Sequence, residues 1–189
     1  MDYVVHDSSQ GADRTDIIDK EGEHVWYNDA FKYWEDSEIC PISDDGVLGG
    51  FGKLTPMDTR DSNQFLDVVK AKRPELQFDM AADCGAGIGR VAKNLLLPRF
   101  NMVHLVEQSP RLLASAPEYM GPESNGKIQC IVLGLQDFDP APNTYDVIWI
   151  QWVIGHLHDL DFVRFFRRCA KGLRPGGIIA LKDNTTENC

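Results

Sequence analysis

From residue 78 onward, short apolar runs alternate with longer segments in which apolar residues recur at helical spacing. The apolar runs have the composition of strands buried on both faces, and they cover residues 78–83, 101–107, 127–133, 145–151 and 177–183. The helical segments between them cover residues 88–97, 109–120 and 159–173, and a loop is predicted over residues 134–144. The alternation predicts a largely parallel α/β sheet covered on both faces, with ligands bound beyond the carboxyl ends of its strands.

The chain before the first predicted strand contains two further helices and a loop. An aromatic stripe over residues 25–38 predicts the first helix. Residues 40–52 (CPISDDGVLGGFG) predict a loop through their Pro, Asp and Gly content. The second helix is predicted to begin at about Ser62, a plausible N-cap, and to stop at Pro74.

Composition and charge fit one globular domain with an acidic extension. Residues 1–24 are polar and acidic without a sustained period, so we expect a disordered tail there and a single domain over residues 25–189. A chain of 189 residues that is 43% hydrophobic is long enough to bury a core. The net charge of -10 argues against nucleic acid as a partner and favours a cationic one.

Cellular location and metal content are also limited by the sequence. It contains no signal-peptide core and no apolar run long enough to span a bilayer, so we expect no membrane contact and a cytoplasmic or nuclear location. The five cysteines are scattered without a C-x-x-C pair, which favours reduced thiols over disulfides or a zinc ribbon. His158 and Asp159 alone are too few ligands for a metal, and we expect Asp159 to cap a helix.

Three glycines follow the first predicted strand at alternate positions, in "DMAADCGAGIGR" over residues 79–90. Glycine lets the chain turn sharply there and brings backbone N–H groups close to a ligand at a helix N-terminus. The spacing G-x-G-x-G differs from the G-x-G-x-x-G of dinucleotide sites. Glu107 ends the second strand, 22 residues beyond Gly85, where an acid can accept hydrogen bonds from a ribose. The pattern predicts a nucleoside-containing ligand, and the alternative is a turn selected only for packing.

Four stretches resemble one family of enzymes. They are "YWEDSEICPISDDGVLGGFG", "DCGAGIGRVAKNLLLP", "GLQDFDPAPNTYDVIWIQWVIGHL" and "LRPGGIIALKDN", and they extend the resemblance from about residue 26 to residue 184. The chain resembles the protein α-N-terminal methyltransferases, which are class I S-adenosylmethionine-dependent enzymes acting on proteins that begin Xaa-Pro-Lys. The resemblance implies a Rossmann-like fold with an N-terminal helical extension, S-adenosylmethionine as cofactor, and proteins with free Xaa-Pro-Lys N-termini as substrates.

The resemblance also implies a set of cofactor-binding residues. Arg90 would reach the methionine carboxylate, and Glu107 would take the ribose in place of the aspartate common in the family. The full set is Gly85, Arg90, Glu107, Gln108, Ser109, Leu135, Gln136 and Gln151, with Leu135 and Gln136 beside the adenine. The alternatives are a solvated helix position for Arg90 and a core position for Leu135.

The acceptor site requires a proton acceptor, because an α-amine is mostly protonated near neutral pH. His156 follows the fourth predicted strand, and an unperturbed pKa of about 6.5 suits a general base. The family uses the matching histidine in this way, and Asn184 resembles the residue that hydrogen-bonds the incoming amine. His156 and Asn184 are therefore the expected catalytic residues, and the alternatives are a structural histidine and a turn asparagine.

Three more residues resemble the walls of the family's substrate channel. Trp34 and Trp152 present flat faces that suit a substrate proline, and Leu48 belongs to the glycine-rich "LGGFG" loop that helps to close over the substrate. Together with His156 and Asn184 they form the expected substrate-binding set. The alternatives are core tryptophans and an ordinary turn.

The chain ends at Cys189, five residues after Asn184, whereas the resembled family continues with a helix and an antiparallel strand pair. We therefore expect a sheet that lacks the last strands, together with the acidic residues they carry. Two other functions stay open. One is a class I methyltransferase for a different acceptor, and the other is a non-catalytic cofactor-binding or regulatory partner that self-associates or pairs with a paralogue through an exposed sheet edge.

Overall fold

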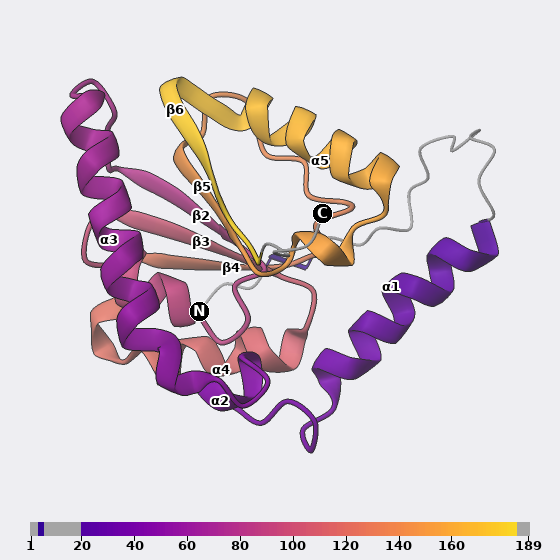
Figure 1. Ribbon diagram of the computed structural model, residues 1–189. Coiled ribbons are helices and arrows are strands. Elements are labelled where there is room, and N and C mark those ends of the chain that lie inside the picture. Colours follow the sequence, from indigo (N-terminus) through magenta and orange to yellow (C-terminus); the bar gives the residue numbers. More distant parts are fainter. Residues whose placement is uncertain (1–3, 6–19, 185–189) are drawn as a thin grey trace.

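A computed structural model describes residues 4–5 and 20–184 of the chain (Figure 1). Its centre is a six-stranded sheet in the order β1-β4-β3-β2-β5-β6, and every neighbouring pair is parallel. The strands are β1 (Val4–Val5), β2 (Met80–Cys84), β3 (Met102–Glu107), β4 (Ile128–Val132), β5 (Tyr145–Gln151) and β6 (Leu173–Lys182). The predicted parallel α/β architecture is confirmed.

Helices cover both faces of the sheet, and α3 and α5 lie on opposite sides of it in Figure 1. The α-helices are α1 (Lys20–Glu35), α2 (Asp44–Val47), α3 (Thr55–Lys72), α4 (Pro110–Met120) and α5 (Asp159–Gly172). Short turns of other helix types are η1 (Gly52–Leu54), η2 (Ala92–Leu96), η3 (Pro122–Ser124) and η4 (Ile154–His156). Side chains from α3, η2 and α4 fill one core cluster, and Phe165 and Cys169 of α5 fill the other.

Several predicted boundaries are corrected by the structure. Helix α3 begins at Thr55 and not near Ser62, because Pro56 occupies its first turn, where the missing N–H costs no hydrogen bond. Ser62 lies buried inside that helix and does not cap it. Helix α1 begins at Lys20, five residues before the expected start of the domain at residue 25. The rest of the expected tail, except β1, lies outside the described residues.

The glycine turn between β2 and η2 is packed tightly on both sides. Gly85 has a φ of +76°, and a Cβ atom there would lie 2.6 Å from the Cγ2 of Val153. Gly89 has a φ of +83°, and a Cβ atom there would lie 2.8 Å from the Sδ of Met120. Left-handed backbone and close neighbours both exclude larger residues. Packing is therefore one reason for these glycines, whatever ligand the turn also binds.

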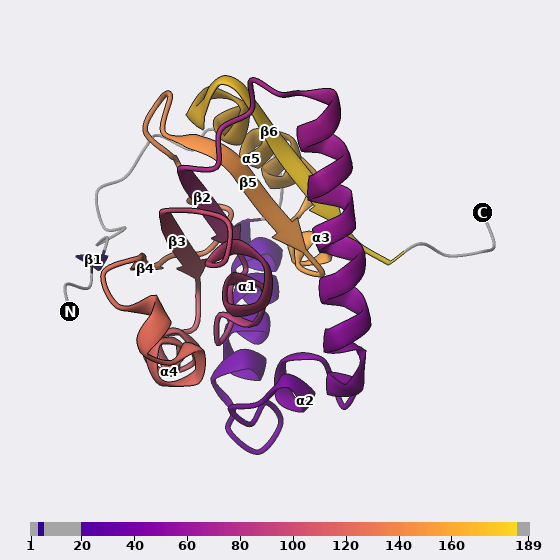
Figure 2. The same ribbon diagram turned by 90° about the vertical axis from the view of Figure 1, so that its left-hand side faces the viewer.

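The carboxyl ends of the central strands meet at one edge of the sheet, where α1 and α2 lie across them (Figures 1 and 2). Strand β5 ends at Gln151, and Trp152 directly after it has a φ of +56°. A bulky residue in this region of backbone space is strained by roughly 1–3 kcal/mol. The chain turns sharply at this point, which brings η4 to the edge that the other strand ends share.

Candidate functional site

A cavity lies beyond the carboxyl ends of β2, β3 and β5, and residues of α1 and α2 complete its wall. All the site residues predicted from the sequence line this cavity, except Ser109 and Asn184. They are Trp34, Leu48, Gly85, Arg90, Glu107, Gln108, Leu135, Gln136, Gln151, Trp152 and His156. The rule that ligands bind at the carboxyl edge of a parallel sheet therefore located the cavity correctly.

Glu107 connects the end of β3 to the glycine turn after β2. Its Oε2 accepts a hydrogen bond of 3.0 Å from the N–H of Gly87, and its Oε1 accepts one of 2.8 Å from the N–H of Ser109. Burial raises the pKa of Glu107, and the N–H groups of Ser109, Gly87 and Gln108 offset only part of this rise. The two carboxylate oxygens together have about four lone pairs, more than these N–H groups occupy. The residue can therefore accept hydrogen bonds from ligand hydroxyl groups as well.

Ser109, a predicted cofactor residue, does not line the cavity. Its side chain is fully buried at the N-terminus of α4, where its Oγ accepts a hydrogen bond of 3.1 Å from the N–H of Leu112. The same Oγ donates to Glu35 of α1. The hydroxyl therefore caps α4, and the N–H of Ser109 connects it to the cavity through Glu107.

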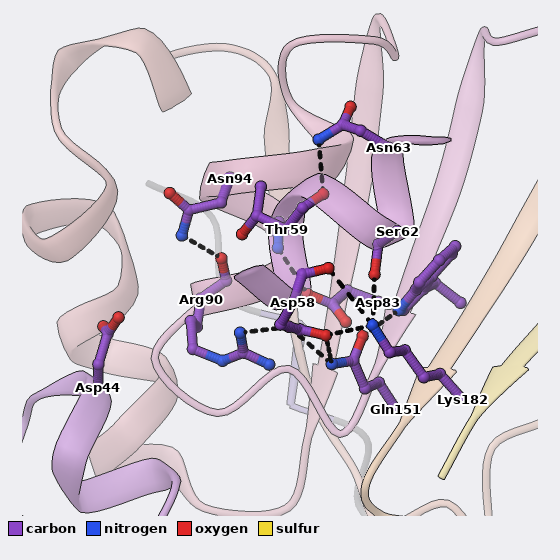
Figure 3. Close-up of polar contacts among 12 residues, drawn as sticks. Asp44, Asp58, Thr59, Ser62, Asn63, Asp83, Arg90, Asn94, Gln151 and Lys182 are labelled. Atoms are coloured by element: carbon purple, nitrogen blue, oxygen red, sulfur yellow. Dashed lines mark hydrogen bonds and ion pairs between the residues drawn. The ribbon is translucent and has the colours of Figure 1, made fainter. Parts of the chain in front are cut away.

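Arg90 is only 5% exposed and forms a buried ion pair, so the alternative of a solvated helix position is wrong. Its Nη1 lies 2.7 Å from Oδ2 of Asp58, and the ring of Trp152 lies 5.1 Å from its Cζ. Asp58 also accepts hydrogen bonds of 2.9 Å from the Nε2 of Gln151, and an ion pair with Lys182 completes the group (Figure 3). We call Asp58, Arg90, Gln151 and Lys182 the Asp58 cluster.

Sequence reasoning missed Asp58 and Lys182. The start of α3 was placed after Asp58, so this residue fell between the predicted loop and the predicted helix. Burial would raise the pKa of Asp58, but the hydrogen bonds from Lys182, Arg90 and Gln151 outweigh that effect and lower it. The carboxyl group is therefore ionised in the folded protein near neutral pH.

Asp83 is a second carboxyl group that the sequence analysis did not single out. It lies at the end of β2, lines the cavity and accepts a hydrogen bond of 3.0 Å from the N–H of Ala92. Burial raises the pKa of Asp83 to about 7, against the lowering effects of the Ala92 N–H and of Arg90. A position at the carboxyl end of a buried strand was the signal that could have identified it.

His156 lies in η4 on the side of the cavity nearest α1. The ring of Trp34 lies edge-on to it with 6.0 Å between centroids, and Trp26 donates a hydrogen bond of 2.8 Å from Nε1 to its carbonyl oxygen. Burial lowers the pKa of His156 below its usual value, and Asp183 opposes this only in part. The imidazole is therefore neutral at pH 7 and can accept a proton.

Asn184 is exposed and does not line the cavity. It lies two positions past the end of β6, and its N–H donates a hydrogen bond of 2.8 Å to Oδ1 of Asp183. The carboxyl end of β6 reaches the same edge of the sheet through Lys182, whose carbonyl oxygen accepts a 3.0 Å hydrogen bond from the N–H of Trp152. The expected contact between Asn184 and an amine stays a prediction.

Leu48 and its neighbour Val47, the last residue of α2, both line the cavity. Val47 lies close to the glycine turn, since a Cβ atom on Gly87 would lie 3.5 Å from its Cγ1. Helix α2, which precedes Leu48, is capped at its start by the side chain of Ser43. Tyr119 of α4 donates a hydrogen bond to the Asp44 carboxylate at the same end. The loop is thus anchored on one side, while Leu48 lines the cavity on the other.

Arg111 at the start of α4 holds the end of α1 in place. Its Nη2 donates hydrogen bonds of 2.7 Å to the carbonyl oxygen of Trp34 and of 2.8 Å to that of Cys40. Tyr27, nearer the start of α1, donates a hydrogen bond of 2.9 Å to Oδ2 of Asp161. Helix α1 therefore spans from α4 to α5 across the cavity.

The part of the chain that the structure describes contains no group of His, Cys, Asp and Glu side chains arranged to hold a metal ion. His158 packs instead against the rings of Trp26 and Tyr27, with centroid distances of 5.3 Å and 5.5 Å. Among the same described residues, no helix is both long and apolar enough to cross a membrane.

The sequence of this chain is similar to those of known proteins. The sequence model of the family described as AdoMet dependent proline di-methyltransferase matches residues 22–189. A rat relative (Rattus norvegicus), N-terminal Xaa-Pro-Lys N-methyltransferase 1, is 45% identical over 168 residues, which are 88% of this chain and 74% of the relative. The zebrafish relative (Danio rerio) of the same name is 46% identical over 165 residues, which are 87% of this chain and 73% of the relative.

Solved structures of methyltransferases are similar to this chain. A SAM-dependent methyltransferase from Leishmania major has a TM-score of 0.76 and 36% identity, covering 86% of this chain and 62% of that one. Phosphoethanolamine N-methyltransferase 1 from Haemonchus contortus has a TM-score of 0.63 and 19% identity, covering 87% of this chain and 33% of that one. The second likeness shows a shared fold alone.

Proposed function

Because this chain belongs to the AdoMet dependent proline di-methyltransferase family, we propose that it transfers methyl groups from S-adenosylmethionine to the free α-amino group of proteins that begin Xaa-Pro-Lys. One observation carries the proposal: the residues suited to the cofactor and those suited to an amine line the same cavity. Glu107 and Arg90 lie toward the strand ends, and His156 lies toward α1.

The residues of the cavity fit S-adenosylmethionine, whose positively charged sulfur carries the methyl group that an amine can attack. The lone pairs left on Glu107 suit the ribose hydroxyl groups. The cavity side of the Arg90 guanidinium suits the methionine carboxylate. Leu135, which is 7% exposed, offers an apolar surface for the adenine.

His156 supports the acceptor half of the proposal. An α-amine has a reference pKa of about 7.7–8.0 and must lose a proton before its lone pair can react. The lowered pKa of His156 leaves its imidazole neutral, so it can take that proton within the cavity. We assign Trp34 and Trp152 to the walls around the substrate proline and Asn184 to the amine itself. The net charge of -10 favours substrates that carry a lysine near the N-terminus.

The comparisons do not favour the two alternatives, a different acceptor or a non-catalytic cofactor-binding partner. Pairing with a second copy or with a paralogue, and a location in cytoplasm and nucleus, stay proposals. Substrate chemistry separates the two enzymatic functions, because an enzyme for internal lysines does not distinguish a free N-terminus from a blocked one.

The test is mass spectrometry of three peptides after incubation with the chain and S-adenosylmethionine. The first begins Ser-Pro-Lys, the second is the same peptide N-acetylated, and the third has alanine in place of proline. We expect methyl groups on the first peptide only. Equal methylation of the first two peptides would contradict the N-terminal acceptor, and equal methylation of the first and third would contradict the requirement for proline.

A further inference from the structure

The Asp58 cluster joins three elements around one carboxylate. Asp58 comes from the first turn of α3, Gln151 ends β5 and Lys182 ends β6, while Arg90 follows the glycine turn. Asp58 and Arg90 are 6% and 5% exposed. Figure 3 shows Gln151, Lys182 and Arg90 all directed at the Asp58 carboxylate. The four side chains thus form one connected polar group, and its members Arg90 and Gln151 line the cavity.

Contacts on two sides fix the guanidinium of Arg90. Asp58 binds its Nη1 at 2.7 Å, and its Cζ lies over the ring of Trp152, 5.1 Å from the ring centroid. Within the described residues, no protein acceptor is recorded for its Nε or Nη2, and the side chain lines the cavity. An arginine held before its ligand arrives loses less conformational freedom on binding than one that must be ordered at that moment.

The charges of the cluster leave one positive charge uncompensated. Asp58 carries one negative charge, and Arg90 and Lys182 carry one positive charge each, so the sum is +1. Lys182 is also hydrogen-bonded to the Oγ of Ser62 at 3.0 Å, which keeps its ammonium on the α3 side of the cluster. The remaining positive charge is therefore presented by Arg90 to the cavity, where an anionic group of a ligand can pair with it.

We propose that Asp58 is a positioning residue for the cofactor. It holds Arg90 so that the free guanidinium N–H groups meet the carboxylate of S-adenosylmethionine. Lys182 balances the negative charge of Asp58. The proposal rests on the proposed function only in the choice of cofactor and requires nothing of the acceptor. Asp58 itself does not contact the reacting atoms. Asp58 therefore affects the binding affinity only of ligands that carry the methionine end of the cofactor.

A merely structural role for Asp58 must be separated from this one. Two ligands make the distinction: S-adenosylhomocysteine has the carboxylate, and 5′-methylthioadenosine shares the adenosine but lacks the amino-acid end. Isothermal titration calorimetry of Asp58→Asn should show S-adenosylhomocysteine binding weakened by about tenfold and 5′-methylthioadenosine binding unchanged. Asp61→Asn is the matched control, because Asp61 lies on the same helix in an exposed pair with Arg60. It should bind both ligands as the unaltered chain does.

Lys182→Met provides a second variant in case Asp58→Asn does not fold, and we expect it also to weaken S-adenosylhomocysteine selectively. Equal weakening of both ligands would overturn the proposal, as would tighter binding of S-adenosylhomocysteine by Asp58→Asn, which would mean that Asp58 opposes the carboxylate. Failure of the unaltered chain to bind S-adenosylhomocysteine would overturn it as well. Because no acceptor is present, a failure of the proposed peptide methylation leaves these results unaffected.

Discussion

Glu107 accepts a hydrogen bond of 3.0 Å from the N–H of Gly87, so the last residue of β3 contacts the turn that follows β2. Two strands that are neighbours in the sheet thereby share one polar contact at the edge of the cavity. The acid is held before any ligand binds, and its position depends on the glycine turn. This contact links the shape of the turn to the ribose-binding role that we propose for Glu107.

Replacing Glu107 should therefore weaken cofactor binding according to the chemistry of the new side chain. Glu107→Gln places an amide NH2 among backbone N–H groups and should weaken S-adenosylhomocysteine binding about tenfold or more, because a donor then faces donors. Glu107→Asp keeps the charge and should lose less. Calorimetric titration checks both values, and equal losses in the two variants would contradict the role assigned to the carboxylate.

Gly85→Ala should destabilise the protein by about 2–4 kcal/mol. The variant combines a left-handed φ of +76° with a Cβ atom 2.6 Å from Val153. Gly126→Ala is the matched control, because Gly126 has a φ of +72° but no atom near its Cβ position. It should cost only roughly 1–2 kcal/mol. Urea unfolding measures both, and an equal cost would show that the contact with Val153 contributes nothing.

Asp83 should make the ligand-free protein less stable as pH rises from about 4 to about 7. The folded protein holds a proton on Asp83 up to about pH 7, whereas the unfolded chain releases it near the ordinary pKa of 3.8. In this window the folded state binds more protons, so the free energy of unfolding falls with increasing pH. Asp83→Asn lacks this titration and should gain about 2 kcal/mol relative to the unaltered chain between about pH 5 and pH 7.5. Chemical unfolding at both pH values measures the free energy of unfolding of each protein. The same change with pH in both proteins would exclude the raised pKa of Asp83.

His156→Gln should lower kcat by about 100-fold or more, because glutamine cannot take a proton from the amine. The lowered pKa of His156 leaves it neutral above its usual titration range, so the acceptor amine sets the pH dependence between about 6.5 and 8. We expect kcat/KM to rise up to about pH 8 in both proteins, with the same midpoint. His158→Gln is the control in the same loop and should retain activity. A shifted midpoint in His156→Gln would mean that His156 itself titrates in this range.

The strands and the place of the cavity were predictable, because apolar runs mark buried strands and parallel strands share a carboxyl edge. The Asp58 cluster was not predictable. Lys182 and Asp58 are 124 positions apart, and no periodic pattern pairs them. Ser62 was misleading, since a serine before an apolar stretch has the features of a helix cap, whereas here it bonds to Lys182 inside α3.

Two more features could not be predicted from the sequence. The resemblance assigned Ser109 to the cofactor and gave no sign that its hydroxyl caps α4; its contact with the cofactor stays a prediction. Trp152 was assigned to a wall of the cavity, yet its φ of +56° is a conformation that bulky residues seldom adopt. Contacts with Arg90 and with the carbonyl oxygen of Lys182 accompany that conformation, and neither could be deduced from the order of residues.

Arg111 holds the end of α1 through the carbonyl oxygens of Trp34 and Cys40 and not through their side chains. Backbone acceptors are the same for every residue type, so the hydrogen bond to position 34 does not depend on the side chain of Trp34. The wall that faces the acceptor can therefore change its chemistry by substitution while its place over the cofactor residues stays constant. Under the proposed function, new acceptor preferences can arise on this scaffold from exchanges in α1 alone, without rebuilding the sheet edge proposed to bind the methyl donor.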